Sequence, residues 1–189
     1  MEKITIKELA PYLPYKLQWV FEGSDDVHEV VGLDITDFGV HIISPYGDSG
    51  RCSIKEGKPL LRPLSQLTEE ICHNGEKFVP IEEIAKIEAP DITGAKEKIH
   101  SITSFNRGLS LNSRQRGVTY KYEGVAVEIT HYKDAVFHKK VINGNDSWVF
   151  SYFHNYPEIL RKLHEWHFDV FGLIDRGIAL PIDGKEVKL

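Results

Sequence analysis

The sequence predicts an α+β fold, in which antiparallel sheets with short central helices carry a C-terminal amphipathic helix packed on the sheet. Runs of β-branched and aromatic residues separated by turn residues occur at 17–44 and again from residue 118. The clearest helical periodicity lies near the C-terminus, and the helix signals in the middle of the chain are short. Strands that follow one another directly, without alternating helices, favour antiparallel sheets over a parallel one.

Length and composition are those of a globular protein. The 189 residues are 41% hydrophobic and 27% charged, which is enough to bury one core, so we expect a single domain over 1–189. Apolar runs are far shorter than the roughly 20 residues that cross a bilayer, and the N-terminus lacks the apolar segment of a secretory signal. We therefore expect a soluble, cytoplasmic protein that makes no membrane contact.

The N-terminal segment carries the pattern of a capping box. Thr5 and Glu8 have the spacing at which each side chain can bond the other residue's backbone N–H. Pro11 and Pro14 then interrupt helical hydrogen bonding. The sequence predicts a short helix that ends near Ala10, followed by an extended connection at 11–15.

Three strands and two short helices are expected next. The strands form an antiparallel meander ended by the loop 45–50, and they span Leu17–Glu22, His28–Ile35 and Phe38–Ser44. Ser65 is a plausible N-cap for a helix over Gln66–His73, which Asn74 and Gly75 would close in a left-handed conformation. Pro80 suits the first position of a second helix, through about Glu88.

Residues 90–117 have few apolar side chains and many Gly, Ser, Thr and Asn residues. Because such a long structureless loop is uncommon inside a domain, we expect this segment to be mobile, folded on a partner, or partly helical around Lys96–Ile102. Alternation of apolar and polar residues then predicts strands at 118–122 and 125–129. Ala135–Ile142 and Ser147–Phe153 are expected to form a hairpin around 143–146.

The C-terminal helix is expected to run from Pro157 to near Gly172. A broad apolar stripe follows its helical spacing: Ile159, Leu160, Leu163, Trp166, Val170, Phe171 and Ile174. Trp166, His167 and Phe171 are therefore predicted to be structural anchors. Arg161, Lys162 and Glu165 fall opposite and are expected to be exposed and replaceable.

Three segments cover about a third of the chain, at residues 6–15, at 58–65 continuing through 74–81, and at 163–174 with 177–180. These segments resemble a family of uncharacterised proteins encoded by phages and prophages of Bacteroides and related gut bacteria. The third segment contains the run Leu163-His164-Glu165-Trp166-His167-Phe168-Asp169. This resemblance implies a phage-type gene product in a bacterial cytoplasm, and it implies no activity.

His164 and His167 are the candidate metal ligands. A spacing of three residues puts both rings on one face of a helix, and His131 or His154 could supply a third ligand. The competing interpretation, which we favour, is a pair of core histidines that bond backbone carbonyls. No Cys-x-x-Cys pair or Gly-x-Ser-x-Gly elbow is present, and Cys52 and Cys72 are expected to be reduced thiols.

Arg62 is also predicted to be a structural anchor. It lies between Pro59 and Pro63 among leucines, and a buried guanidinium needs a carboxylate or carbonyl partner. Asp169 and Glu165 are the expected partners. A ligand carboxylate or phosphate is the alternative.

Charge is spread unevenly along the chain. Residues 1–92 hold 17 acidic and 9 basic side chains, whereas 93–142 hold 9 basic and 4 acidic ones. With aromatic residues interleaved, the second segment is a candidate surface for single-stranded nucleic acid. Its candidate contact residues are Arg107, Arg114, Arg116, Lys121, Lys139 and Lys140.

No catalytic constellation is legible, and the sequence gives no sign of a cofactor. We therefore expect a non-enzymatic phage or prophage accessory protein that acts by binding another protein, of phage or host. The first alternative is a nucleic-acid-associated protein that uses 93–142. The second is a metal-dependent enzyme that uses the histidine pair.

Overall fold

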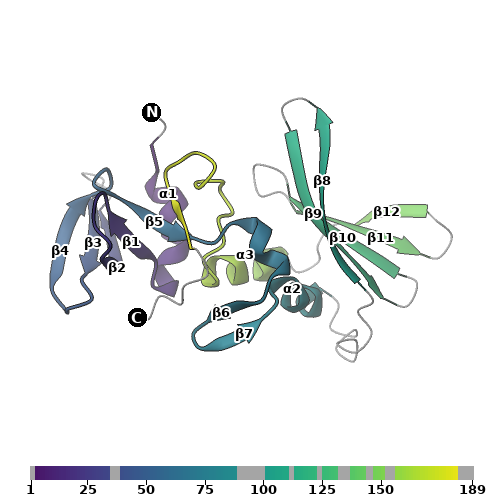
Figure 1. The fold of residues 1–189 in the computed structure, drawn as a ribbon, viewed down its shortest axis with the longest axis horizontal. Helices are drawn as coiled ribbons and strands as arrows, with labels where there is room; N and C mark the ends of the chain where they lie inside the picture. Colours follow the sequence, from purple (N-terminus) through teal and green to yellow (C-terminus); the bar gives the residue numbers. More distant parts are fainter. Residues whose placement is uncertain are drawn as a thin grey trace. The chain divides into compact units, whose positions relative to one another are not determined.

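The computed structural model describes residues 3–34, 39–88, 101–110, 113–122, 125–131, 137–143, 147–151 and 156–182, with the backbone alone over 101–151 and at 68, 85, 86 and 88. These residues form a six-stranded sheet, a five-stranded sheet, a two-stranded hairpin and short helices (Figure 1), which confirms the predicted α+β class. The chain divides into two compact units, residues 1–64 with 160–189 and residues 65–159. Whether the two fold as one domain stays a prediction.

The six-stranded sheet belongs to the first unit, and its strand order is β13-β5-β1-β2-β3-β4. The strands are β1 Gln18–Phe21, β2 Val27–Asp34, β3 Gly39–Ile43, β4 Ser49–Ser53, β5 Gly57–Leu61 and β13 Leu180–Pro181. Neighbours pair antiparallel except β13, which runs parallel to β5. The meander β1-β2-β3 is thus confirmed.

The loop at 45–50 does not end the meander, contrary to the sequence prediction. The chain turns tightly after Ile43 and returns as β4, whose residues Ser49 to Ser53 pair with β3. This strand was missed because serine, glycine and arginine supply little β propensity. Here the pairing with β3 overrides local preference.

One face of this sheet is packed in the core. Val30 and Ile42 pair across β2 and β3 and are both buried, and Trp19 of β1 is fully buried. Gly57 of β5 lies directly against the Trp19 indole, because a Cβ at this position would overlap Trp19 Nε1 and the Val20 carbonyl oxygen. The Trp19 indole can therefore pack against β5 only because residue 57 is a glycine.

The N-terminal segment is helical for longer than predicted. Helix α1 spans Ile6–Leu9 and continues as a 3-10 helix, η1, over Ala10–Tyr15, so the expected extended connection at 11–15 is wrong. A proline φ near −65° fits 3-10 geometry as well as extended structure, and the sequence alone does not separate the two. Lys16, with a left-handed φ of 58°, ends the segment.

The middle of the chain corrects another prediction. A 3-10 turn, η2, covers Leu64–Thr68, and β6 Ile71–His73 with β7 Glu76–Phe78 form a hairpin in place of the expected helix 66–73. Asn74 and Gly75 have φ of 53° and 79°, the left-handed pair of a type I′ hairpin turn. The left-handed backbone expected of these two residues is confirmed, but it forms a hairpin turn and not the end of a helix. Helix α2, Pro80–Glu88, is as predicted.

The five-stranded sheet has the order β12-β11-β10-β9-β8 and is antiparallel throughout. Its strands are β8 Ser101–Ser110, β9 Ser113–Tyr122, β10 Val125–His131, β11 Phe137–Asn143 and β12 Ser147–Ser151. The strands predicted from residue 118 onward are confirmed. For 90–117 the sequence predicts a mobile segment, a partner-folded one or a partial helix around Lys96–Ile102, but 101–110 and 113–117 are paired strands, so a helix is wrong for 101–102. Residues 90–100 and 111–112 lie outside the described part.

The C-terminal helix α3 spans Tyr156–Glu165 and ends earlier than predicted. The His167 N–H donates to His164 O at 3.0 Å and the Phe168 N–H to Leu163 O at 2.8 Å, with His167 at a left-handed φ of 59°. These two bonds form a Schellman motif, which ends a helix and usually places glycine where His167 lies. The apolar residues after Glu165 therefore leave the helix and continue as a chain of turns.

The core of the first unit takes side chains from both ends of the chain. The residues that are least exposed in this unit include Leu9, Tyr12, Leu17, Trp19, Val30, Leu61, Leu163, Phe168 and Leu173. Trp166, the residue directly after α3, is 4% exposed, and Lys162 Nζ lies 5.8 Å from the centre of its ring. The residues that follow α3 therefore complete a core begun by the first residues of the chain.

We expect Trp166→Ala to lower the free energy of unfolding by about 3–5 kcal/mol, because it leaves a cavity in this core. Glu165→Ala is the control: it removes only partly exposed ion pairs with Arg161 and Lys162, worth less than about 1 kcal/mol. Chemical denaturation followed by circular dichroism measures both. A Trp166→Ala protein as stable as the wild type would mean that Trp166 is not a core residue.

Candidate functional site

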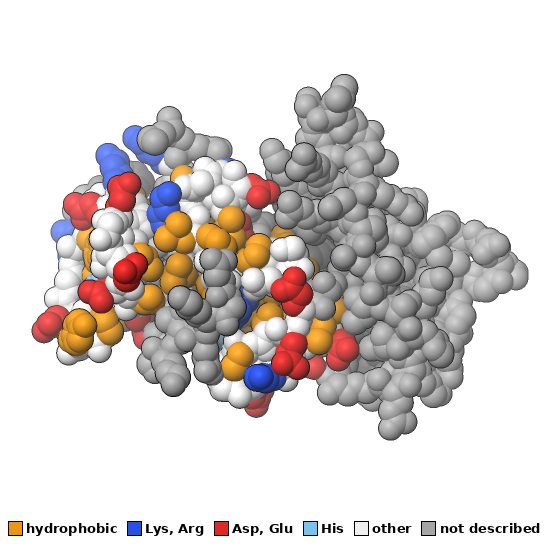
Figure 2. Space-filling model, viewed as in Figure 1, with side chains coloured by type: hydrophobic (Ala, Val, Ile, Leu, Met, Phe, Trp, Pro, Cys, Tyr) orange, Lys and Arg blue, Asp and Glu red, His pale blue; other side chains and the backbone are white. Residues whose placement is uncertain are grey.

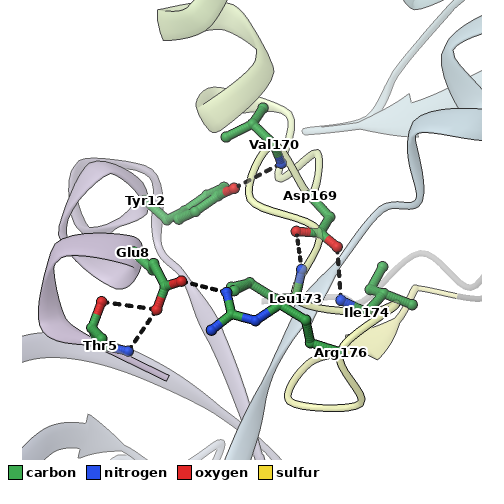
Figure 3. A network of polar contacts seen from close by, with 8 residues as sticks. All are labelled: Thr5, Glu8, Tyr12, Asp169, Val170, Leu173, Ile174 and Arg176. Carbon is green, nitrogen blue, oxygen red and sulfur yellow. Dashed lines mark hydrogen bonds and ion pairs between the residues drawn. The ribbon is translucent and has the colours of Figure 1, made fainter. Parts of the chain in front are cut away.

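A network of polar groups joins the first and last segments of the first unit (Figure 3). We call it the terminal clasp and define it as Thr5, Glu8 and Tyr12 with Asp169 and Arg176, together with the backbone groups they bond. Helices α1 and η1 supply the first three residues, and the turns after α3 supply the other two. Because perturbed ionisable groups gather at functional sites, the clasp is the first place to look for chemistry.

Tyr12 is at the centre of the clasp and is fully buried. Its hydroxyl donates to Phe168 O at 2.8 Å and accepts from the Val170 N–H at 3.3 Å. Burial raises the tyrosine pKa far above its ordinary value, against the lowering effect of the Val170 hydrogen bond. A phenol that stays neutral and has both hydrogen-bonding roles filled by backbone is a structural link.

Asp169 is a buried carboxylate that holds the turn after it. Its two oxygens accept the Leu173 N–H at 2.8 Å and the Ile174 N–H at 2.7 Å. Burial raises the Asp169 pKa, while the backbone hydrogen bonds oppose that effect. A carboxyl group with a raised pKa is a common general acid, but here both oxygens are engaged by backbone amides, so the group organises the chain.

Glu8 ties the N-terminal helix to the C-terminal segment. It accepts from the Thr5 N–H at 2.7 Å and from the Thr5 hydroxyl at 2.8 Å, and it forms an ion pair with Arg176. Burial raises the Glu8 pKa, but the hydrogen bonds from Arg176 and Thr5 outweigh it, so the net pKa is lower than usual. The predicted capping box is thus confirmed, and its Glu8 carboxylate also binds Arg176, a residue 168 positions away.

Arg62 meets the C-terminal segment through its backbone. Its N–H donates to His167 O at 2.7 Å and its carbonyl accepts the Asp169 N–H at 2.8 Å, which makes a parallel bridge with Phe168. The side chain is 8% exposed. Of the two expected partners, Asp169 meets Arg62 through this main-chain bond, and the Glu165 carboxylate is engaged by Arg161 and Lys162.

The two histidines do not form the helical pair that suggested a metal site, because His167 lies beyond the end of α3. His167 is buried, and its Nε2–H donates to the Tyr15 carbonyl oxygen at 2.7 Å. The His164 ring packs edge-on to Tyr12 at 4.9 Å and stacks on Phe171 at 6.0 Å, and burial lowers its pKa. Phe171, a predicted anchor, is half-buried there.

Other metal and thiol chemistry has little support in the described part of the chain. Among those residues no three His, Cys, Asp or Glu side chains gather where a metal could bind. His154 and the side chain of His131 lie outside them. Cys52 and Cys72 are free, and burial raises the pKa of the Cys52 thiol, which makes it less reactive.

The six-stranded sheet has exposed apolar side chains on β2, on β3 and in the turn before β4, which the sequence analysis does not predict. Among residues with described side chains, the exposed large apolar ones are Val31 at 50%, Ile43 at 38% and Tyr46 at 80%. Figure 2 shows hydrophobic side chains among charged ones over this sheet. The doublets Val30-Val31 and Ile42-Ile43 could have signalled it, since in a strand one residue of each doublet must leave the core face.

The six basic candidates lie on strands of one sheet but at positions of opposite faces. By register, positions 107, 121 and 140 share one face, and positions 114, 116 and 139 share the other. The six basic positions predicted to form one surface are therefore divided equally between the two faces of a single sheet.

Comparison with known proteins identifies no relative of the chain. No protein-family model, curated protein or solved structure matches it. In the described residues, no helix combines the length and apolar character that crossing a membrane requires.

We expect Glu8→Gln to destabilise the protein by about 1 kcal/mol at pH 7, and the loss to vanish in acid. Because the folded state lowers the Glu8 pKa, ionised Glu8 stabilises it above pH of about 4.5, and this contribution is lost as the pH falls through the lowered pKa. Chemical denaturation at pH 7 and near pH 3 measures the difference in free energy of unfolding between the variant and the wild type. Asp169 is present in both proteins, so the effect of its own titration cancels in this difference.

Glu70→Gln is the matched control for this measurement. Glu70 lies 3.8 Å from Lys77 with both side chains more than 60% exposed, so we expect no measurable loss at either pH. An equal effect of both substitutions, or a Glu8→Gln loss that grows in acid, would contradict the role assigned to the Glu8–Arg176 pair.

Proposed function

We propose that this chain is a non-enzymatic binding protein that recognises another protein through the β2–β4 end of its six-stranded sheet. The observation that carries the proposal is the exposure of Val31, Ile43 and Tyr46 in this one region. Scattered apolar residues on a surface are ordinary, but large ones gathered on neighbouring strands are typical of interaction sites. A phage or prophage accessory role in a bacterial cytoplasm, which the resemblance implies, is part of the same proposal.

The outer face of these strands is set by pairing in the sheet. Val30 and Ile42 pair and face the core, so Ile43, the next residue on β3, lies on the opposite face, where it pairs with Glu29. The register shifts between Val30 and Gly32, which marks a β-bulge at Val31. Bulges often redirect a side chain, and this one holds Val31 half exposed.

Tyr46 is presented by a well-bonded turn. The Ser44 N–H donates to Asp48 O at 2.8 Å and the Gly47 N–H to Ser44 O at 3.0 Å. The Ser44 hydroxyl accepts the N–H groups of Tyr46 and Asp48 at 3.2 and 3.1 Å. A rigid backbone under an exposed tyrosine favours binding, because little conformational entropy is lost when the ring is covered.

The neighbouring edge supports the same use. β4 is the last strand of the sheet, and Ser49, Gly50 and Arg51 on it are exposed. Arg51 forms an ion pair with Asp34 at 2.7 Å, which fixes a charged rim beside the apolar side chains. An apolar centre with a polar rim is the usual composition of a protein interface.

We expect the combined variant Val31→Thr, Ile43→Thr and Tyr46→Ser to lose the partners that the wild-type protein captures from a lysate of phage-infected bacteria. All three changes are at exposed positions, so the melting temperature should shift by only a few degrees. The control variant replaces exposed polar residues elsewhere, Lys7, Lys55 and Glu69, with serine and should capture the wild-type set. Quantitative mass spectrometry of the captured proteins measures the loss; an unchanged set in the apolar variant would refute the proposed surface.

A further inference from the structure

The five-stranded sheet has a continuous register across all of its strands. Each antiparallel pair from β8 to β12 is aligned residue by residue, with one shift near Gly108. Since successive residues of a strand alternate between faces, this register assigns every position to one face of the sheet. The two faces differ in composition.

One face has an apolar row at its centre, and it also carries the basic positions Arg114, Arg116 and Lys139. A row of directly paired positions crosses all five strands without a charged residue: Ile102, Tyr120, Val127, Val141 and Val149. Two residues along, the same face holds Val118 and Ile129. An antiparallel sheet with one such face usually packs that face and leaves the other to solvent.

The other face mixes basic and aromatic positions, and we call it the mixed face. It holds three basic positions, Arg107, Lys121 and Lys140, and three aromatic ones, Phe105, Trp148 and Phe150. Lys140 and Phe150 are directly paired, and Trp148 lies two residues from Phe150 on the edge strand β12. The register therefore brings basic and aromatic positions together on one face.

The charge of the five-stranded sheet indicates which kind of ligand it would bind. The five strands contain six basic residues and one acidic residue, Glu128, in a chain whose net charge is −5. Glu128 is itself paired with Lys140 in the register. A basic sheet in an acidic protein is complementary to a polyanion.

We propose that the mixed face binds single-stranded nucleic acid, with Arg107, Lys121 and Lys140 at the phosphates and Trp148 and Phe150 stacking on bases. Single strands need a basic track together with aromatic rings. Both faces carry basic and aromatic positions, but the apolar row of the other face favours packing, which leaves the mixed face for the ligand. A duplex offers its phosphates but keeps its bases stacked away from such rings, so single strands are preferred. This site is separate from the β2–β4 surface and does not depend on it.

Lys139 and Lys140 provide a matched test because they are adjacent, equally charged and on opposite faces. Binding of a fluorescent oligothymidylate is measured by anisotropy over a series of salt concentrations. We expect Lys140→Gln to weaken binding severalfold and to reduce the log–log salt slope by about 0.7, and Lys139→Gln to change neither. The triple Gln variant of Arg107, Lys121 and Lys140 should lower the slope by about 2, and that of Arg114, Arg116 and Lys139 should not.

The aromatic part of the site has its own readout. We expect Trp148→Ala to weaken binding about 5- to 150-fold without changing the salt slope, because stacking releases no counterions. Circular dichroism melting curves confirm that each variant is folded. The proposal is overturned if the wild type does not bind the oligonucleotide, if it binds a duplex as tightly, or if the Lys139 and Lys140 variants weaken binding equally.

Discussion

The first unit depends on the main-chain bridge between Arg62 and the residues that follow α3. Two backbone hydrogen bonds fix His167 and Asp169 to Arg62, and β13 then pairs with β5 immediately beside it. Residues more than 100 positions apart thereby become neighbours, so the ordering entropy of a long chain opposes this contact. The bridge holds because buried side chains from both ends surround it, Tyr12 and Phe168 among them.

The polar groups around this bridge serve it and are not available for chemistry. Tyr12, Glu8 and Asp169 have unusual pKa values, which often marks an active site, yet their polar atoms are engaged within the chain. The Tyr12 hydroxyl and the Glu8 carboxylate bond the C-terminal segment, and the Asp169 carboxylate holds the turn that follows it. His167 is similar: it occupies a left-handed position that normally suits glycine, and its Nε2–H donates to the Tyr15 carbonyl oxygen. The proposed functions accordingly use other residues, on the surfaces of the two larger sheets.

The sequence predicted most of what local pattern controls. The strands of the meander, helix α2 and the strands from residue 118 follow from alternation, caps and prolines, and they are where the pattern placed them. Helix α3 was predicted too long because the apolar spacing continues after Glu165, although the chain has left the helix at His167. The spacing of apolar residues predicts which side chains are buried, but it does not distinguish a helix from a series of packed turns.

What the sequence could not predict comes from distant pairing. Strands β4 and β8 have low intrinsic β propensity and exist because β3 and β9 pair with them. Alternation predicts that one residue of each doublet, Val30-Val31 and Ile42-Ile43, leaves the core, but which one does so depends on the pairing of β2 with β3. In the same way, the division of the basic residues between two faces requires the strand register, which composition does not contain.

The clasp account is tested most directly by the free energy of unfolding of Tyr12→Phe, with Tyr46→Phe as control. Tyr12→Phe keeps the buried ring and removes only the hydroxyl that bonds Phe168 O and the Val170 N–H, whereas the Tyr46 ring is 80% exposed. The account predicts a loss of about 1–3 kcal/mol for Tyr12→Phe and none for Tyr46→Phe. A Tyr12→Phe protein as stable as the wild type would show that the two ends of the chain are held together by something other than this clasp.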